Sequence, residues 1–291
     1  MSNVYSLKLT KQQEDLLLNT WKECLSTPPQ YAKWQLKCEN CVITCYTSGK
    51  TVFQGKDAKI YASAFLPKNE NIVLYKNDTL PQAGSDEVGT GDYFGPVVVC
   101  ACIIDGNTDT LLKRLGTRDS KQLTDKDICK IAPQLISAIP HSLLIVEDEK
   151  YNVVHETNNL NAIKAKLHNQ AYVHLANKFG LPQFKIIDQF TPEKSYYRYI
   201  SKEPTIIQNI HFETKAEDKY PSVGAASVIA RYAFLKKMDQ MEQQWEIEFP
   251  KGAGNKVDIA AREFVKKYGF DQLHRVAKMH FKNTEKLNVF K

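Results

Sequence analysis

Apolar residues near the start of the chain recur at helical spacing. Leu17, Trp21 and Leu25 would lie on one face of a helix. Thr10 stands three residues before Gln13, which is the spacing of a capping box, in which two side chains satisfy free amide groups at a helix start. The pattern therefore predicts a helix that begins just after Thr10 and extends to Leu25.

Between Trp34 and Gln54 the hydrophobic period changes to two, as expected for strands. Cys41, Ile43 and Cys45 fall on one face, and the residues between them fall on the other. Ser48-Gly49-Lys50 is a turn signal, after which the strand pattern resumes. This segment is predicted to form a hairpin.

A second helix is predicted near residues 58–65, which completes a small α/β module. The polar segment 77–84 contains Pro and Gly and is typical of a linker between domains. We therefore expect an N-terminal domain over residues 1–80 and a second domain over residues 81–291.

The hydrophobic pattern is different after this linker. Residues 97–104 form a continuous apolar run rich in β-branched residues, which is typical of a strand buried on both faces. Further strands are predicted at 143–146 and 184–187, and helices at 161–179 and from Ser222 to about Trp245. Strands that alternate with helices indicate a layered α/β domain.

Composition and charge restrict the class of protein. Lys plus Arg minus Asp plus Glu is 39 − 33 = +6, and the isoelectric point is near 8.8. This modest excess suits a polyanionic partner, although a mildly basic protein without one has the same charge. The N-terminal residues lack a signal-peptide pattern, and the longest apolar run is too short to span a bilayer. Seven cysteines without a secretion signal predict reduced thiols in the cytoplasm.

The segment with the most chemical information is 84–96, GSDEVGTGDYFGP. Its adjacent acids, Asp86 and Glu87, precede a glycine-rich turn and a buried strand. One interpretation is a nucleotide-binding loop, but the glycines do not follow G-x-G-x-x-G and no Walker Lys-Ser/Thr follows. A second is an ordinary turn with solvated acids. A third is a metal site beside a loop that a nucleic acid can approach, because glycine has no side chain to block it.

Two further acidic positions lie near expected strand ends or helix starts. Asp188 directly follows the apolar strand at 184–187, where open α/β sheets place functional groups. Glu217 and Asp218 precede the helix that starts near Ser222. Each position has a structural alternative, since Asp caps helices and acids favour helix N-termini. Together they suggest three acidic sites in one domain.

Cysteine and histidine positions offer a weaker alternative. The cysteines between residues 38 and 45 suggest a zinc site, but Cys41 and Cys45 share one strand face and no nearby histidine completes a ligand set. Small buried thiols are the simpler interpretation. His168 and His174 lie in a predicted helix, and we expect them to be packing or surface residues.

Segment 84–96 resembles the first motif of the type 2 ribonucleases H. Other stretches up to residue 286 are similar to the same family. They are Asp119-Ser120-Lys121-Gln122-Leu123, Tyr151-Asn152, Asn159-Leu160-Asn161, His168-Asn169-Gln170-Ala171, Ile187-Asp188, Lys215-Ala216-Glu217, Ala225-Ala226-Ser227-Val228-Ile229-Ala230-Arg231 and His280-Phe281-Lys282-Asn283-Thr284-Glu285-Lys286.

Two features resemble the HIII subtype in particular. The turn reads Gly89-Thr90-Gly91, where HII proteins usually carry Gly-Arg-Gly, and an extra module precedes the catalytic region. The resemblance implies an α/β protein with a ribonuclease H-like fold, a mixed central sheet flanked by helices. The module would be a small TATA-binding-protein-like α/β domain that binds substrate.

By the same resemblance, Asp86, Glu87, Asp188 and Glu217 would be the catalytic and metal-binding carboxylates. Counting back from the Ala225 motif selects Glu217, and Asp218 would then be a solvated neighbour. The implied activity is endonucleolytic hydrolysis of the RNA strand of RNA/DNA hybrids by two divalent ions. Mg²⁺ is expected, with Mn²⁺ possible, and the products would be 5′-phosphate and 3′-hydroxyl ends.

The resemblance also implies which residues contact the hybrid. The backbone of Gly89-Thr90-Gly91 would sense the 2′-hydroxyl, which distinguishes RNA from DNA. Ser120 and Lys121 would contact phosphates, unless they only begin a helix. Tyr46, Thr47, Ser48 and Lys50 would follow the hybrid backbone, unless they form a solvated hairpin tip. We expect a monomer that does not associate with membranes.

Two alternatives and one geometric difficulty remain. The chain could prefer single ribonucleotides embedded in DNA, as HII enzymes do, or could bind hybrids without cutting them. The difficulty concerns Asp86 and Glu87, because adjacent strand residues point to opposite faces and cannot both point inward from a regular strand. Distortion of the strand by the following glycine turn is one possible solution.

Overall fold

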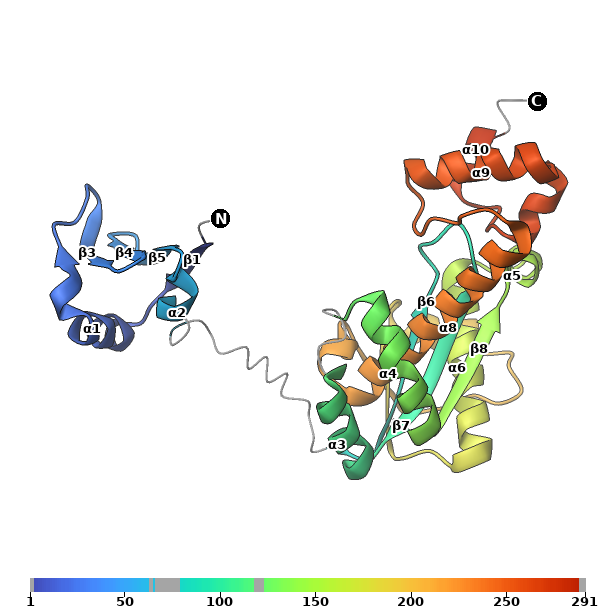
Figure 1. Ribbon diagram of the computed structural model, residues 1–291. Helices are drawn as coiled ribbons and strands as arrows, with labels where there is room; N and C mark the ends of the chain where they lie inside the picture. The colour runs from blue at the N-terminus through green and yellow to red at the C-terminus, as the bar shows by residue number, and fades with distance from the viewer. Residues whose placement is uncertain (1–2, 63–64, 66–78, 118–122, 288–291) are drawn as a thin grey trace. The chain divides into compact units, whose positions relative to one another are not determined.

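The computed structural model describes residues 3–62, 65, 79–117 and 123–287. The chain divides into two compact units, Met1–Val73 and Leu74–Lys291 (Figure 1). The domain boundary near residue 80 stays a prediction. Among the described residues, no helix is both long and apolar enough to cross a membrane.

The N-terminal unit is built on one antiparallel sheet with strand order β1-β5-β4-β3-β2. Its elements are β1 (Asn3–Lys8), α1 (Lys11–Thr20), the 3₁₀ turn η1 (Lys22–Cys24), β2 (Leu25–Ser26), β3 (Ala32–Cys38), β4 (Cys41–Tyr46), β5 (Lys50–Gly55) and α2 (Ala58–Ala62). The predicted inward face is confirmed, because Cys41, Ile43 and Cys45 are buried in the core of this unit. The cysteines proposed as an alternative zinc set therefore include two core thiols.

The first helix is correct at its start and wrong at its end. Thr10 and Gln13 form the predicted capping box. However, α1 ends at Thr20, and Leu25 begins β2 instead of continuing the helix. Leu25 pairs with Leu36 of β3, so pairing with a distant strand overrides the local helical spacing.

The segment predicted as one hairpin contains three strands. The additional turn lies at Glu39-Asn40, between β3 and β4, where Cys38 faces Cys41. Asn40 adopts a left-handed backbone with φ of +57°, a conformation that Asn tolerates better than most residues. Asn40 is therefore the sequence signal for this turn, which was not predicted.

The C-terminal unit is built on a mixed sheet with strand order β10-β9-β6-β7-β8. Its central strand, β6, runs parallel to β9 and antiparallel to β7. The outer strands pair as β10 with β9 in parallel and β8 with β7 in antiparallel fashion. The strands are β6 (Gln82–Val88), β7 (Val97–Ile104), β8 (His141–Val146), β9 (Phe184–Asp188) and β10 (Ile210–Glu213).

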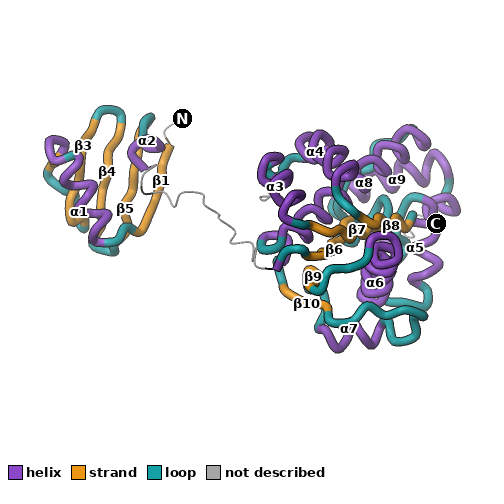
Figure 2. The backbone as a smooth tube through the Cα atoms, turned by 90° about the horizontal axis from the view of Figure 1, so that it is seen from below, coloured by secondary structure: helices purple, strands orange, loops and turns teal. Residues whose placement is uncertain are grey.

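Helices cover both faces of this sheet, as Figure 2 shows from below. One face packs on α8 and on α4 and α9 beyond it, and the other packs on α6 and α7. The helices are α3 (Gly106–Leu115), α4 (Asp125–Ala138), α5 (Asp148–His155), α6 (Leu160–Phe179), α7 (Glu193–Tyr199), α8 (Pro221–Trp245), α9 (Asn255–Tyr268) and α10 (Lys282–Leu287), with 3₁₀ turns η4 (Ala216–Asp218) and η5 (Phe270–Arg275). The predicted fold class, a mixed sheet flanked by helices, is confirmed.

The strand predicted at 97–104 is confirmed as β7, and its side chains are buried on both faces. Val98 and Cys100 pack in the core on the α8 side, whereas Val99 and Ala101 pack in the core on the α6 side. This double burial explains why the run is apolar without alternation.

The linker predicted at 77–84 is wrong at its C-terminal end, because β6 already begins at Gln82. The Gln82 side chain is buried, and its Oε1 accepts a hydrogen bond from Ser222 Oγ at 2.8 Å. Its Nε2 donates to Thr79 Oγ1 at 2.9 Å. A polar residue can thus belong to a buried strand when tertiary partners satisfy its amide.

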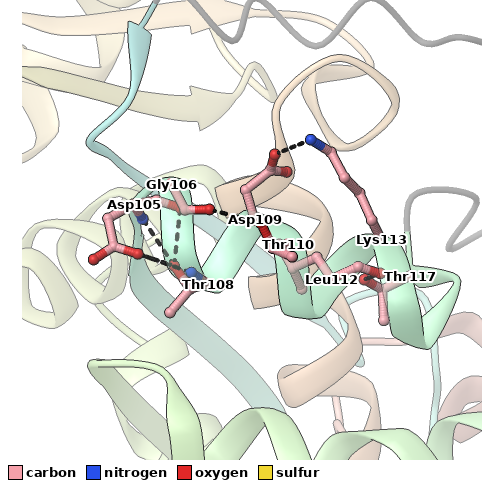
Figure 3. Close-up of polar contacts among 8 residues, drawn as sticks. All are labelled: Asp105, Gly106, Thr108, Asp109, Thr110, Leu112, Lys113 and Thr117. Carbon is pink, nitrogen blue, oxygen red and sulfur yellow. Dashed lines mark hydrogen bonds and ion pairs between the residues drawn. The ribbon is translucent and has the colours of Figure 1, made fainter.

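Helix α3 precedes the segment 118–122 and is closed at both ends (Figure 3). Asp105 and Thr108 form a capping box at its start, and Gly116 ends it with φ of +69°. An ion pair joins Asp109 to Lys113 at 2.7 Å. The predicted phosphate contacts, Ser120 and Lys121, lie outside the described residues.

The contact between β6 and the start of α8 leads to a stability prediction. A Cβ atom added at Gly84 would lie 2.5 Å from the Val223 amide nitrogen, so Gly84→Ala is expected to destabilise the fold by about 3 kcal/mol. At Gly106 nothing lies within 4 Å of the added Cβ, and Gly106→Ala is the matched control. Chemical denaturation of the two variants checks this, and equal stabilities would contradict it.

Candidate active site

Asp86 and Glu87 occupy the C-terminal half of β6 and point to opposite faces of the sheet. Asp86 faces α8, where it lies beside the side chain of Ser227. Glu87 faces α6, where it pairs with Lys164 and accepts a hydrogen bond from His168 Nε2 at 2.8 Å. The strand alternation is therefore regular.

Both acids nevertheless line one cleft, which lies at the C-terminal end of β6. The cleft has a volume of about 430 Å³. It is lined by Asp86, Glu87, Val88, Leu123, Asp125, Ile128, Asp188, Glu217, Ser227, Val228 and Arg231. All four acids selected from the sequence are in this set, and Asp218 is not.

Asp188 connects the sheet to the turn that carries Glu217. Strand β9 runs parallel to β6 with Ile187 opposite Ser85, so Asp188 ends its strand beside Asp86. Asp188 Oδ1 accepts a hydrogen bond from the Ala216 amide at 2.9 Å. The side chain thereby holds the 3₁₀ turn in which Glu217 is the next residue.

The carboxylates of the cleft lie close enough together to change one another's pKa. Burial, together with the nearby charge of Glu87, raises the pKa of Asp86 to about 8. Burial and the charges of Glu217 and Glu87 also raise the pKa of Asp188. A cation placed among these carboxylates would lower both pKa values again.

Comparison with known proteins agrees with this geometry. Residues 83–284 match the family model described as Ribonuclease HII, and residues 4–76 match one described as a domain of unknown function. The ribonuclease HIII of Bacillus mycoides (strain KBAB4) is 39% identical over 305 residues, with 98% of each chain covered. The chain belongs to the ribonuclease HIII family. It is accordingly an endoribonuclease, a hydrolase of phosphodiester bonds.

Solved structures of ribonucleases H support this assignment. The structure of Bst-RNase HIII in complex with Mn²⁺ matches with a TM-score of 0.73 at 36% identity, covering 99% of both chains. Ribonuclease H2 from Pyrococcus horikoshii OT3 matches with a TM-score of 0.61 at 25% identity and covers 72% of this chain and 97% of its own.

In this ribonuclease HIII, Glu87 lies beside the basic side chains of Lys164 and His168. Burial alone would raise the pKa of Glu87, but the hydrogen bond and charge of His168, together with the charge of Lys164, outweigh it and hold the pKa below its usual value. The other nitrogen of His168, Nδ1, lies 2.7 Å from Ser85 Oγ. Glu87 is thus ionised and fixed in position.

The role of these two basic residues was not predicted from the sequence. His168 is fully buried, in agreement with a packing residue, but its ring connects Ser85 to a carboxylate of the cleft. His174, by contrast, is exposed and hydrogen-bonds Gln170. Lys164 within an apolar helix face was the available signal, because a buried lysine requires an anionic partner.

The position of His168 leads to a second prediction. His168→Gln is expected to lower kcat by about 10- to 100-fold, as for residues that orient metal-binding carboxylates. KM for a hybrid should change much less, since His168 lies beneath Glu87 and away from the cleft surface. Steady-state kinetics check this, with His174→Gln as the matched control. A variant with unchanged kcat would contradict it.

The glycine loop, residues 89–96, lies at the end of β6 and combines packed and open positions. Gly89 has φ of +93°, and an added Cβ would collide with the Pro96 carbonyl oxygen. Gly95 has φ of +86° and packs on Met238. Gly91 is exposed, and nothing lies within 4 Å of a Cβ added there. The fold therefore requires glycine at 89 and 95 but not at 91.

The predicted substrate residues of the N-terminal unit surround one tight turn. Tyr46 ends β4 and Lys50 begins β5, and the Gly49 amide donates a hydrogen bond to the Tyr46 carbonyl at 2.9 Å. Thr47, Ser48 and Lys50 are exposed, and Tyr46 is partly buried. These side chains are accessible in their own unit, and their contact with substrate stays a prediction.

The donor set of the cleft fits a hard divalent cation. Carboxylate oxygens are the ligands that Mg²⁺ prefers. Within the described part of the chain, no three His, Cys, Asp or Glu side chains converge into a ready-made ion site. Mg²⁺ keeps several waters and is often bound by one or two carboxylates together with substrate phosphates, so the carboxylates of the cleft fit such an ion.

Proposed function

We propose that this ribonuclease HIII hydrolyses the RNA strand of RNA/DNA hybrids endonucleolytically, with divalent ions bound at Asp86, Glu87, Asp188 and Glu217. The observation that carries the proposal is that these four acids, from three separate segments, line one cleft. The products would be 5′-phosphate and 3′-hydroxyl ends. Bst-RNase HIII, which matches this chain over 99% of its length, was solved in complex with Mn²⁺.

When bound, two divalent ions would supply the positive charge that activates a water and stabilises the leaving oxygen. The protein residues supply position and charge. Glu87 is kept ionised by Lys164 and His168. Asp188 is oriented by the Ala216 amide, which also sets the position of Glu217. Mg²⁺ is the proposed ion, with Mn²⁺ as a substitute.

The rim of the cleft provides basic groups for a polyanion. Arg231 lines the cleft, and its Nε donates to Asp125 Oδ1 at 3.1 Å. Lys251 pairs with the same carboxylate. A positive rim around negative carboxylates suits a phosphodiester that reaches the acids together with metal ions. We also propose that Ser120 and Lys121 contact phosphates and that Tyr46, Thr47, Ser48 and Lys50 contact the hybrid backbone.

The glycine loop would provide RNA selectivity, with the backbone of Gly89-Thr90-Gly91 next to the 2′-hydroxyl. Support comes from Gly91, which the fold leaves open. Gly91→Ala is therefore expected to keep the melting temperature of the wild type and to lower kcat/KM on a hybrid at least about 10-fold, because the methyl group would occupy the space of the substrate. Unchanged kcat/KM would remove Gly91 from the contact surface.

Two less specific proposals accompany this function. Seven free thiols are consistent with a reducing cytoplasm. A monomer is also proposed. Sedimentation of the purified protein tests the second point.

The decisive experiment is cleavage of an end-labelled RNA/DNA hybrid by the full chain, with and without Mg²⁺ or Mn²⁺. The proposal expects internal cuts in the RNA strand only, dependence on the ion, and 5′-phosphate and 3′-hydroxyl ends by end-group analysis. Faster cutting of a DNA duplex with one embedded ribonucleotide would favour HII-type specificity. Tight binding of the hybrid without ion-dependent cleavage would favour a non-catalytic role and defeat the proposal.

A further inference from the structure

The interior of the C-terminal unit contains a lysine with no exposed surface. Lys278 is 0% exposed, and its ionic partner Asp148 is 2% exposed, with Lys278 Nζ 3.6 Å from Asp148 Oδ1. Both lie outside the set of residues that lines the carboxylate cleft. A buried ion pair contributes little net stability, because desolvation of the two charges offsets their attraction. Its presence therefore suggests a role in positioning.

The hydrogen bonds of Lys278 go to the glycine loop. Its ammonium donates to the Asp92 carbonyl oxygen at 2.9 Å and to the Gly95 carbonyl oxygen. Its main-chain amide donates to the Tyr93 carbonyl oxygen at 2.9 Å. Lys278 thus donates hydrogen bonds to three carbonyl groups of the loop. Its ammonium group has three N–H donors and its main chain has one, so it can form all three bonds.

Helix α5 holds the segment that carries Lys278. Asn152 Nδ2 donates to the carbonyl oxygens of His274 and Ala277 at 2.9 and 2.8 Å. Asn152 Oδ1 accepts from the Met279 amide at 2.9 Å. Asp148 lies one turn earlier on the same helix and faces the ammonium group. Helix α5 therefore holds this segment through hydrogen bonds to its backbone and through the ion pair with the Lys278 side chain.

A second anchor fixes the loop on its other side. Asp92 Oδ1 accepts a hydrogen bond from the Gly252 amide at 2.6 Å, and the Tyr93 amide donates to the Gly252 carbonyl oxygen at 2.9 Å. The residues from Asp92 to Gly95 are thus held from two directions. Between this clamped part and β6 lie Thr90 and the open Gly91.

We propose that Lys278, with Asp148 and Asn152, is a positioning residue that fixes the backbone of Gly89-Thr90-Gly91 for recognition of the RNA strand. The proposal rests on the function proposed above. A loop with glycines at 89, 91 and 95 has high conformational freedom when unrestrained, and its ordering costs binding energy. Lys278, Asp148 and Asn152 order the loop when the protein folds. The loop is therefore already in place when substrate arrives, and binding does not have to order it.

The test uses the full chain with Lys278→Met combined with Asp148→Asn, which removes both charges and leaves neither one buried alone. Lys267→Met is the matched control, since Lys267 forms an exposed pair with Glu246. Three quantities are measured: kcat/KM on an RNA/DNA hybrid, the melting temperature, and the ratio of dissociation constants for a DNA duplex and a hybrid of the same sequence without divalent ion. If the double variant does not fold, Asn152→Ser is assayed in its place.

We expect kcat/KM to fall about 10- to 100-fold and the preference for the hybrid over the DNA duplex to fall towards one. The ion concentration for half-maximal activity should not change, because the carboxylate cleft is untouched. A folded variant with wild-type kcat/KM or with wild-type preference would overturn the positioning role, whatever its melting temperature. Failure of the proposed function itself would be visible separately, as a wild-type chain that does not cut the hybrid.

Discussion

Replacing Asp86 by asparagine is expected to lower kcat on an RNA/DNA hybrid by about 10³-fold. The substitution keeps the shape of the side chain and removes one of the negative charges that would hold divalent ions in the cleft. A loss of about 4 kcal/mol of transition-state stabilisation corresponds to this factor. Single-turnover cleavage at saturating substrate measures it. Full activity of the variant would remove Asp86 from the proposed mechanism.

The same substitution is expected to leave the metal-free protein as stable as the wild type or more stable. The pKa of Asp86 is raised from an ordinary value of 3.8 to about 8 by burial and the charge of Glu87. Between these pH values the native state binds more protons than the unfolded state, so this group makes stability fall as pH rises. Asparagine has no such titration. The variant should therefore lose less stability than the wild type between about pH 4 and pH 8.

Denaturation curves at several pH values, with and without Mg²⁺, measure this difference. At pH 8 without Mg²⁺ the variant should be more stable by at least about 1 kcal/mol. Added Mg²⁺ should stabilise the wild type more than the variant, because an ion that binds only the folded state shifts the folding equilibrium. Parallel pH profiles of the two proteins would contradict the raised pKa of Asp86.

Glu217→Gln is expected to lower kcat at least about 10²-fold, whereas Asp218→Asn should stay within about 3-fold of the wild type. The two acids are adjacent in η4, yet only Glu217 lines the cleft with Asp86 and Asp188. The pair forms its own control, because both substitutions remove one charge from the same turn. The structure supports the choice made by counting back from Ala225, which stays a prediction until measured.

Kinetics of the two variants on one hybrid under identical ion concentrations decide the question. The expected order of kcat is wild type, then Asp218→Asn, then Glu217→Gln. The reverse order would assign the metal-binding role to Asp218 and require the turn to rotate when ions bind. Melting temperatures measured in parallel show whether either substitution acts through folding.

Local sequence signals predicted five elements of the C-terminal unit, β7, β8, β9, α6 and α8, and left its other strands and helices unassigned. Strand β7 has the predicted bounds, and α8 starts one residue before the predicted Ser222, at Pro221. These elements are long or have a strong hydrophobic pattern, and their apolar residues indicate directly that they are buried. The candidate acids were also selected from the sequence, by their positions near the ends of apolar strands and by the resemblance of the surrounding motifs to the type 2 ribonucleases H. Their roles stay a prediction.

Short elements in the N-terminal unit were less predictable. Leu25 has helical spacing, but it pairs with Leu36 in the sheet. Asn40 forms a turn whose only local signal is its tolerance of a left-handed backbone. Gln82, at the start of the C-terminal unit, likewise has the polarity of a linker but lies in β6 with its amide satisfied by Ser222 and Thr79. For Leu25 and Gln82, a partner in another element decided the structure.

The residues themselves indicated the layered α/β class and the buried strands, because the hydrophobic pattern is a local property of a chain. The resemblance of their motifs to the type 2 ribonucleases H selected the four candidate acids. Only the tertiary structure decided how Asp86 and Glu87, on opposite faces of a regular strand, open into one cleft at the strand's end. It alone paired Glu87 with Lys164 and His168, and the glycine loop with Lys278. These partners lie about 80 and 180 residues away in sequence, and no local pattern encodes a contact that forms only when separate elements pack.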